Sequence, residues 1–470
     1  MPYQDVPVPC GRIRRMLPLV GLTARVAGGR LVDVLCDRAG GGASAARFHQ
    51  RTADRYVEVL GRSRGALMKA GQLVSMIDAG AVGSGGFLPY QKALSRLQVE
   101  APPMGAGLVG EILDAELGGA VGCFADFASE PVAAASIGQV HRARLRDGRE
   151  VAVKIQYPGV GRAIRDDLAN TELIATFVRF VTAASNIEID IRALAREAAA
   201  RIREEVDYRR EAAMITAFSE LYRGHPFFRI PDVVPELSGD RVLTMTYLDG
   251  MGWAQAQRAD QDLKNVWAEV VRRFFYSGLR HANLLHADPH PGNYRFHADG
   301  TVGFLDYGCV KVVPELQRRR WVEMVRAVFD DRRVDARDLM SQVGFFDADA
   351  AITAGQLQDW WADIFAEVIG ASQPVTYTPD NMARLIRRVF GSSDHNIHSK
   401  MTIPEHFAFL VRAQFAITAL FVGLQATLPG RSIADDMDGV AEPTTEIGKL
   451  HHAWVRQNRL PSAFDHHNHP

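Results

Sequence analysis

The chain has 470 residues, of which 47% are apolar, and its 54 basic and 55 acidic side chains leave a net charge of −1. This composition excludes a disordered or collagen-like chain and a strongly nucleic-acid-seeking one, so we expect globular domains and no nucleic-acid partner. The four cysteines lie far apart and lack CxxC spacing, which favours neither a disulfide framework nor structural zinc. A reducing, cytoplasmic compartment fits best.

The N-terminal segment is basic. Residues 1–65 contain eleven arginines, no lysine and five acidic residues. Residues 1–42 are predicted to form a basic arm that is either an ordinary solvated segment or an amphipathic contact with an anionic membrane surface. Arg25 and Arg30 interrupt the apolar stretch 17–35, which argues against a spanning helix. The first residues do not resemble a secretory signal.

Helical spacing of apolar residues follows over 43–97, with a glycine-rich interruption at 80–86. Pro102 and Pro103 mark a boundary, and a short helix is predicted over 108–116. We therefore expect residues 43–120 to form a helical extension.

Strand patterns dominate the next region, 121–250. Residues 139–145 and 150–155 alternate around an Asp147-Gly148 turn, which predicts a β-hairpin. Helices are expected over 161–184 and 191–218, and strands over 230–236 and 241–248. The pattern indicates a small β-sheet lobe.

Residues 251–450 are predicted to form a large helical lobe, interrupted by short strands at 293–295 and 302–305. The uncharged run 413–430 is predicted to be a buried core helix, and residues 451–470 a tail. Together these regions predict an α+β, two-lobed fold.

Side chains suited to phosphate chemistry occur in four separate segments. Lys154 ends a Val-Ala-Val-Lys strand, where its cation can neutralise nucleotide phosphates, and Glu205 lies in a helical pattern from which it could orient that lysine. The alternatives are a solvated strand lysine and a charged helix face with i,i+4 pairs.

The other two segments lie further along the chain. Asp288 and Asn293 share a Pro- and Gly-rich loop, a spacing that suits a carboxylate near the transferred phosphoryl group and an amide oxygen on a metal. Asp306 ends an apolar strand and precedes Tyr307-Gly308, which suits Mg²⁺ chelation but also an ordinary turn.

The order Lys, Glu, Asp, Asn, Asp resembles that of the protein-kinase-like fold. An alanine-rich segment, 133–139, stands where a kinase has its glycine-rich loop, and Lys69-Ala70-Gly71-Gln72 lies upstream. With the Glu205-Val206-Asp207 triplet, these motifs resemble the UbiB-like (aarF-type, coenzyme Q8-related) atypical kinase family.

The resemblance implies roles for individual residues. Lys154 would contact phosphates and pair with Glu205, and Asp288 would occupy the catalytic-loop position. Asn293 and Asp306 would bind Mg²⁺. The remaining nucleotide-facing residues would be Ala133, Ala134, Ala135, Ser136, Lys69 and Gln72.

The family resemblance further implies ATP and Mg²⁺ as cofactors, ATPase activity, and support of ubiquinone-type lipid biosynthesis at a membrane. Expected partners are ATP or ADP, anionic lipids or isoprenoid-quinone precursors, and quinone-biosynthesis proteins, with a peripheral location at the inner membrane. No activation loop or Ala-Pro-Glu motif follows Asp306. A nucleotide-gated scaffold without turnover and an aminoglycoside-kinase type phosphotransferase remain alternatives.

Overall fold

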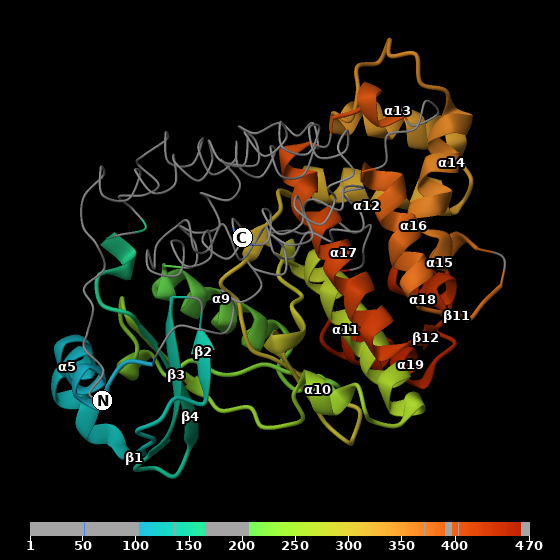
Figure 1. Cartoon of the computed structure of the whole chain (residues 1–470). Coiled ribbons are helices and arrows are strands. Elements are labelled where there is room, and N and C mark those ends of the chain that lie inside the picture. Colours follow the sequence, from blue (N-terminus) through green and yellow to red (C-terminus); the bar gives the residue numbers. More distant parts are fainter. Residues whose placement is uncertain are drawn as a thin grey trace. The chain divides into compact units, whose positions relative to one another are not determined.

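The computed structural model describes residue 51 and residues 103–461, apart from 136, 163, 165–205, 371, 391–396 and 403 (Figure 1). The chain divides into two compact units, which are considered separately. Unit 1 comprises Met1–Ala212 and Val233–Tyr247, and unit 2 comprises Ala213–Asp232 and Leu248–Pro470. The predicted helices over 43–97 and most of 161–184 lie outside the described residues. The predicted five-part division of the chain stays a prediction.

Unit 1 contains an antiparallel, five-stranded sheet in which the strand order is β1-β3-β4-β6 and β2 also pairs with β3. The strands are β1 (Phe124–Phe127), β2 (Ala133–Ala135), β3 (Gly138–Leu145), β4 (Glu150–Gln156) and β6 (Val242–Thr246). The predicted hairpin, β3–β4, is confirmed. Gly148 has a φ of 93° in the turn, a conformation that favours glycine.

The strand β4 contributes to the core of unit 1 and carries the predicted site residue Lys154. Val151, Val153 and Ile155 alternate along it and are fully buried. Lys154 therefore points to the opposite face of the sheet, between its neighbours Val140 on β3 and Leu243 on β6.

The predicted short helix is confirmed as α5 (Ala106–Leu117), which buries Val109, Ile112 and Leu113. A chain of hydrogen bonds joins the segment before α5 to the sheet. The backbone N–H of Met104 donates to Oε1 of Gln139 over 2.7 Å, and Nε2 of Gln139 lies 2.7 Å from Nε2 of His141. Because Nδ1 of His141 faces the carbonyl of Ala128, which only accepts, Nδ1 carries the proton and Nε2 accepts.

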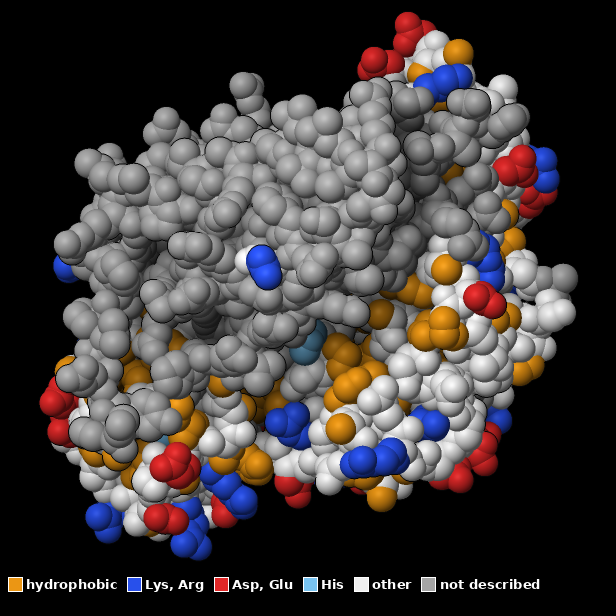
Figure 2. Space-filling model, in the orientation of Figure 1, with side chains coloured by type: hydrophobic (Ala, Val, Ile, Leu, Met, Phe, Trp, Pro, Cys, Tyr) orange, Lys and Arg blue, Asp and Glu red, His pale blue; other side chains and the backbone are white. Residues whose placement is uncertain are grey.

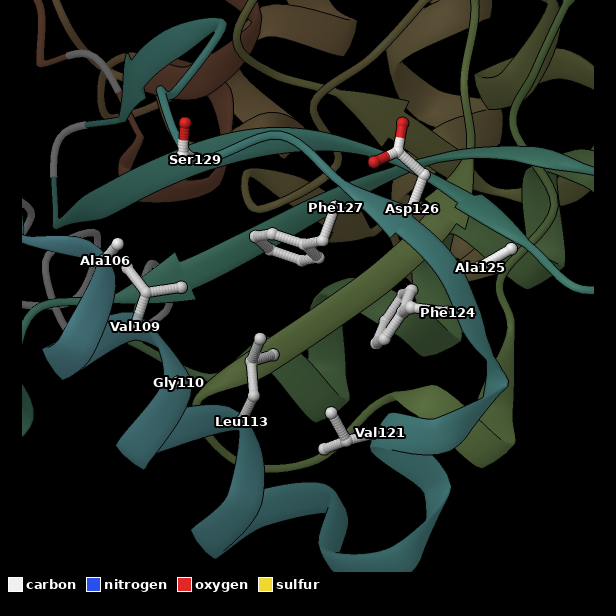
Figure 3. Close-up of a pocket in the computed structure, with 10 residues that line it drawn as sticks. All are labelled: Ala106, Val109, Gly110, Leu113, Val121, Phe124, Ala125, Asp126, Phe127 and Ser129. Atoms are coloured by element: carbon white, nitrogen blue, oxygen red, sulfur yellow. The ribbon is translucent and has the colours of Figure 1, made fainter.

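An apolar cavity of about 390 Å³ lies between α5 and β1 (Figure 3). Val109 and Leu113 of the helix and Phe124 and Phe127 of the strand line it, and Asp126 is the only ionisable residue among the described residues of its wall. With a carboxylate and no cation among those residues, this cavity does not suit phosphate groups.

The prediction of a strand over 230–236 is wrong. The structure instead has the short strand β5 (Phe228–Arg229), an isolated bridge between Val233 and Met245, and the 3₁₀-helix η3 (Pro235–Leu237). Pro235 has no N–H to donate to a strand ladder, which accounts for the break. The following strand, predicted over 241–248, is confirmed as β6.

Unit 2 is mainly helical. The helix α9 (Tyr208–Leu221) begins in unit 1 and continues into unit 2. The others are α10 (Trp253–Ala256), α11 (Gln261–Ala282), α12 (Glu315–Phe329), α13 (Arg333–Val343), α14 (Ala354–Ile364), α15 (Ala366–Ile369), α16 (Pro379–Phe390), α17 (Glu405–Leu424), α18 (Gly430–Met437) and α19 (Glu446–Gln457). The helices α11 and α17 pack against each other (Figure 1).

Short strands interrupt these helices more often than the sequence predicts. The predicted strands at 293–295 and 302–305 are confirmed as β8 (Tyr294–Phe296) and β9 (Val302–Phe304), and β5 joins them in a three-stranded sheet. Two further pairs were not predicted. They are β7 (Leu284–His286) with β10 (Val310–Val312), and β11 (Val375–Thr376) with β12 (Thr427–Leu428).

The core helix predicted over 413–430 is only partly right. The helix α17 ends at Leu424, where Gln425 adopts a left-handed conformation with a φ of 53°. The chain then forms β12 and turns into α18 at Gly430. The apolar composition of the run indicated burial correctly, but it did not mark where the helix ends.

Buried ion pairs tie α11 and α12 to the segment around α18. Arg273 is fully buried, and its Nη1 lies 2.7 Å from Oδ1 of Asp436. Arg280 donates from Nε to Asp438 over 2.9 Å, and Arg326 pairs with Asp435 at 2.7 Å.

Among the residues that the structure describes, no helix is both long enough and apolar enough to cross a membrane. Lys and Arg side chains lie beside Asp and Glu side chains over the described part of the face in Figure 2. This mixing of signs agrees with the near-zero net charge.

Candidate functional site

Unit 1 contains a buried ion pair at one of the predicted site residues. Nζ of Lys154 lies 2.6 Å from Oε1 of Glu211, and the two side chains are 11% and 3% exposed. The lysine also lies over the ring of Tyr208, 5.6 Å from its centroid. Because both partners are buried and hydrogen-bonded, the pair holds the ammonium group in one position on β4.

The structure pairs Lys154 with Glu211. Glu205 lies outside the described residues, so its predicted role stays a prediction. Asp207 caps α9, because its Oδ1 accepts from the N–H of Arg210 over 2.9 Å. Glu211 is thus in the first turn of α9. The sequence signal that could have indicated Glu211 is the helix cap Asp207 followed by an acidic residue in the first turn.

The alanine-rich segment forms a strand rather than a loop. Ala133–Ala135 is β2, paired with β3 in the register Ala135↔Gly138. Gly138 is required at the start of β3, since a Cβ there would lie 2.1 Å from the carbonyl oxygen of Ile155. Ser136, Lys69 and Gln72 lie outside the described residues, and their predicted nucleotide contacts stay predictions.

The structure brings Asp288 and Asn293 together in unit 2. Nδ2 of Asn293 lies 3.3 Å from the carbonyl oxygen of Asp288 and 3.4 Å from its Oδ2. Both hydrogen bonds are long, but they point the amide nitrogen toward Asp288 and the amide oxygen away from it. Pro291 opens the 3₁₀-helix η4 (Pro291–Asn293), which carries the asparagine.

Asp306 is joined to the same loop through the backbone. The N–H of Leu305 donates to the carbonyl of Asn293 over 3.0 Å, and Nε2 of His286 lies 2.6 Å from the carbonyl of Asp306. Since a carbonyl only accepts, Nε2 of His286 carries the proton. Burial lowers the pKa of His286, which keeps the ring neutral near pH 7. Gly308 donates its N–H to Oδ1 of Asp306 over 3.0 Å.

Tyr307 anchors the segment in the core of unit 2. It is fully buried, its ring centroid lies 5.1 Å from that of Phe218, and it packs edge-on against His286 at 5.4 Å. Tyr307 follows Asp306, and His286 lies two residues before Asp288. The same aromatic cluster therefore holds the chain next to both aspartates.

The donor set of Asn293 and Asp306 fits Mg²⁺. Both offer oxygen atoms, and Mg²⁺ is commonly held by one or two carboxylates together with substrate phosphates and water. No group of three or more His, Cys, Asp or Glu side chains within the described ranges is arranged to bind a metal by itself. A metal at this position would need further oxygen ligands from the nucleotide.

Residues 96–339 match the family model described as the ABC1 atypical kinase-like domain. The chain belongs to the ABC1 atypical kinase-like family. The resemblance to UbiB-like and aarF-type proteins is thus confirmed, and so is the kinase-like α+β fold.

Individual relatives extend this similarity. The chain is 33% identical over 351 residues to the mitochondrial atypical kinase COQ8B of Rattus norvegicus, covering 72% of this chain and 65% of the relative. It is 30% identical over 351 residues to COQ8B of Danio rerio, covering 72% and 55%. The chain thus spans less than two thirds of the length of these relatives.

A solved structure is also similar. The Mycobacterium tuberculosis protein Rv3197, determined as a complex with erythromycin, aligns with a TM-score of 0.60 and 28% identity, covering 85% of this chain and 99% of that one.

Proposed function

We propose that this protein binds ATP with Mg²⁺, hydrolyses it, and supports ubiquinone-type isoprenoid lipid biosynthesis at a membrane surface. Family membership supports the kinase-like chemistry. The observation that carries the proposal is the Asp288–Asn293 contact, because it orients an amide oxygen and a carboxylate in one loop joined to Asp306.

The side chains then have distinct tasks. Lys154, held by Glu211, would neutralise phosphate charge. Asn293 and Asp306 would hold the metal, which when bound neutralises charge on the phosphate oxygens. Asp288 would accept a proton from the attacking water or hydroxyl, a role that needs its carboxylate ionised.

The lipid part of the proposal rests on the family. The names of the rat and zebrafish relatives associate those proteins with mitochondria. For this chain we propose a cytoplasmic protein that acts at the inner membrane, with quinone-biosynthesis proteins and isoprenoid precursors or anionic lipids as partners.

The test is a thermal-shift and ATPase comparison of the full chain with Asp306→Asn. Wild type should gain stability with Mg-ATP but not with ATP plus chelator, and Asp306→Asn should lose this gain. The control is Asp299→Asn, since Asp299 lies in the neighbouring hairpin and pairs with the exposed Arg229.

Retention of the Mg-ATP shift by Asp306→Asn would overturn the metal assignment. Adding anionic liposomes should raise turnover, and an absence of any effect would remove the membrane part. Nucleotide binding without measurable turnover would favour a nucleotide-gated scaffold instead.

A further inference from the structure

A second candidate site lies within unit 2, and its lining includes none of the motif residues Asp288, Asn293 and Asp306. A cavity of about 90 Å³ is enclosed by α11, α12, α14, α17 and α18. Its walls are mainly aromatic and aliphatic. They include Phe329, Trp360, Trp361, Phe407, Phe415 and Met437.

One side of this cavity is polar. Arg272, Tyr276 and Arg280 are spaced by four residues along α11 and so share one helix face. The hydroxyl of Tyr276 donates to Oε1 of Gln414 over 2.5 Å. Arg280 is neutralised, because its Nε donates to Asp438 over 2.9 Å.

Arg272 differs from the other buried arginines of unit 2. Arg273, Arg280, Arg318 and Arg326 each pair with a carboxylate. Arg272 is 5% exposed, yet no carboxylate of the described residues lies within ion-pairing distance of it, and its buried Nε has no hydrogen-bond partner among them.

Within the described residues, the contacts of the Arg272 guanidinium are with neutral groups. One Nη donates to the hydroxyl of Tyr377, and the group lies 5.2 Å from the centroid of the Phe421 ring. Glu367 acts electrostatically on Tyr377, but its Oε1 accepts from Asn381 over 2.8 Å. A buried positive charge without a counter-ion is costly, so an anion that enters the cavity would be stabilised there.

We propose that this cavity binds a small aliphatic monocarboxylate, with its carboxylate at Arg272 and its short chain among the aromatic walls. The charge argues for a monoanion, because Arg272 contributes one uncompensated charge and Arg280 is already paired. The size argues for a carboxylate as small as acetate, because 90 Å³ is about three fifths of the roughly 150 Å³ cavity that accepts the six carbons of benzene.

The experiment is calorimetric titration of the full-length protein with sodium acetate, beside sodium chloride and the neutral isostere acetamide. Acetate should bind, and acetamide should bind at least about tenfold more weakly, because it lacks the charge that Arg272 attracts. Decanoate should not fit. Equal heats from acetate and sodium chloride, or no acetate binding, would overturn the proposal.

Two variants test the location. Arg272→Met should abolish acetate binding by removing the charge, and Ala434→Leu should abolish it by filling the cavity while Arg272 is kept. The matched control is Arg318→Met, a buried arginine outside the cavity, which should still bind.

Unchanged binding in Ala434→Leu would overturn the proposal even if Arg272→Met failed to fold. Asp306→Asn should also retain acetate binding, so that failure here and failure of the nucleotide proposal are distinguishable.

Discussion

Lys154 of β4 and Glu211 in the first turn of α9 form a buried ion pair, with Nζ 2.6 Å from Oε1. They are separated by 57 residues of sequence, so the pair fixes the start of α9 against the sheet of unit 1. We expect Glu211→Gln to destabilise unit 1 by about 3–5 kcal/mol, since it leaves a buried ammonium without this carboxylate. Urea unfolding measures the loss.

The control for this pair is Glu150→Gln. Glu150 pairs with Arg142 at the surface, and both side chains are well exposed, so its replacement should cost less than about 1 kcal/mol. The double variant Lys154→Met/Glu211→Leu should recover much of the stability while losing the Mg-ATP response. An unaltered unfolding midpoint in Glu211→Gln would contradict the structural role.

A second prediction concerns Gly138. Alanine there would place Cβ 2.1 Å from the carbonyl oxygen of Ile155, so β2–β3 and β4 cannot keep their spacing. We expect Gly138→Ala to cost about 3 kcal/mol or more. Gly110→Ala is the matched control: its Cβ would meet open space within α5, and it should stabilise by about 0.5–1 kcal/mol. Changes of the same sign in both variants would refute this account.

The buried pair Arg273–Asp436 supports a third prediction. Asp436→Asn should destabilise unit 2 by about 3–5 kcal/mol, because Arg273 is fully buried and would keep only Glu269 as a carboxylate partner. Glu446→Gln breaks the exposed pair with Lys449 and should change stability by about 0.5 kcal/mol or less. Thermal unfolding of the two variants distinguishes these outcomes.

Acid sensitivity is the fourth prediction. Burial lowers the pKa of His225 to about 3, with smaller effects from the charges of His281 and Arg273. Burial likewise holds the pKa of His451 well below its usual value. Nδ1 of His225 accepts from the N–H groups of Phe227 and Phe228, so protonation there would break two hydrogen bonds.

A histidine whose folded pKa is depressed contributes its full stability above its unfolded pKa, near 6.5, and loses it as the pH falls toward the folded value. The loss from His225 should approach about 1.4 kcal/mol per pH unit below that point. His225→Asn keeps an acceptor for the backbone but cannot ionise, so it should reduce the slope of stability against pH between about 3 and 6.5 and leave the part that His451 contributes. His290→Asn removes an exposed imidazole and should leave the slope as it is.

Local patterns predicted part of the fold. The β3–β4 hairpin has alternating side chains and an Asp147-Gly148 turn, both of which act within a few residues. The strands β7 and β10 could not be predicted in this way, because each has three residues and is stabilised by pairing between His286 and Val310, far apart in the chain.

The candidate site likewise has residues that local motifs predict and contacts that they do not. Asp288, Asn293 and Asp306 follow from motif spacing, and the structure joins them through hydrogen bonds. Glu205, the predicted partner of Lys154, lies outside the described residues, so that pairing stays a prediction. The additional pairing with Glu211 was not predicted, because helical periodicity alone does not place the start of α9 at Tyr208, which Asp207 sets through its cap. That no described carboxylate pairs with Arg272 is visible only in three dimensions.

The acidic segment 435–438 has a consequence for synthesis on the ribosome. Arg273, Arg280 and Arg326 emerge more than a hundred residues before Asp436, Asp438 and Asp435, with which they form buried pairs. Until those aspartates emerge, Arg273 and Arg326 have only their local partners Glu269 and Asp330, and burial of Arg280 in particular carries a large desolvation cost. Unit 2 is therefore expected to complete its native packing only near the end of translation, and nascent chains that stop before residue 435 should remain protease-sensitive.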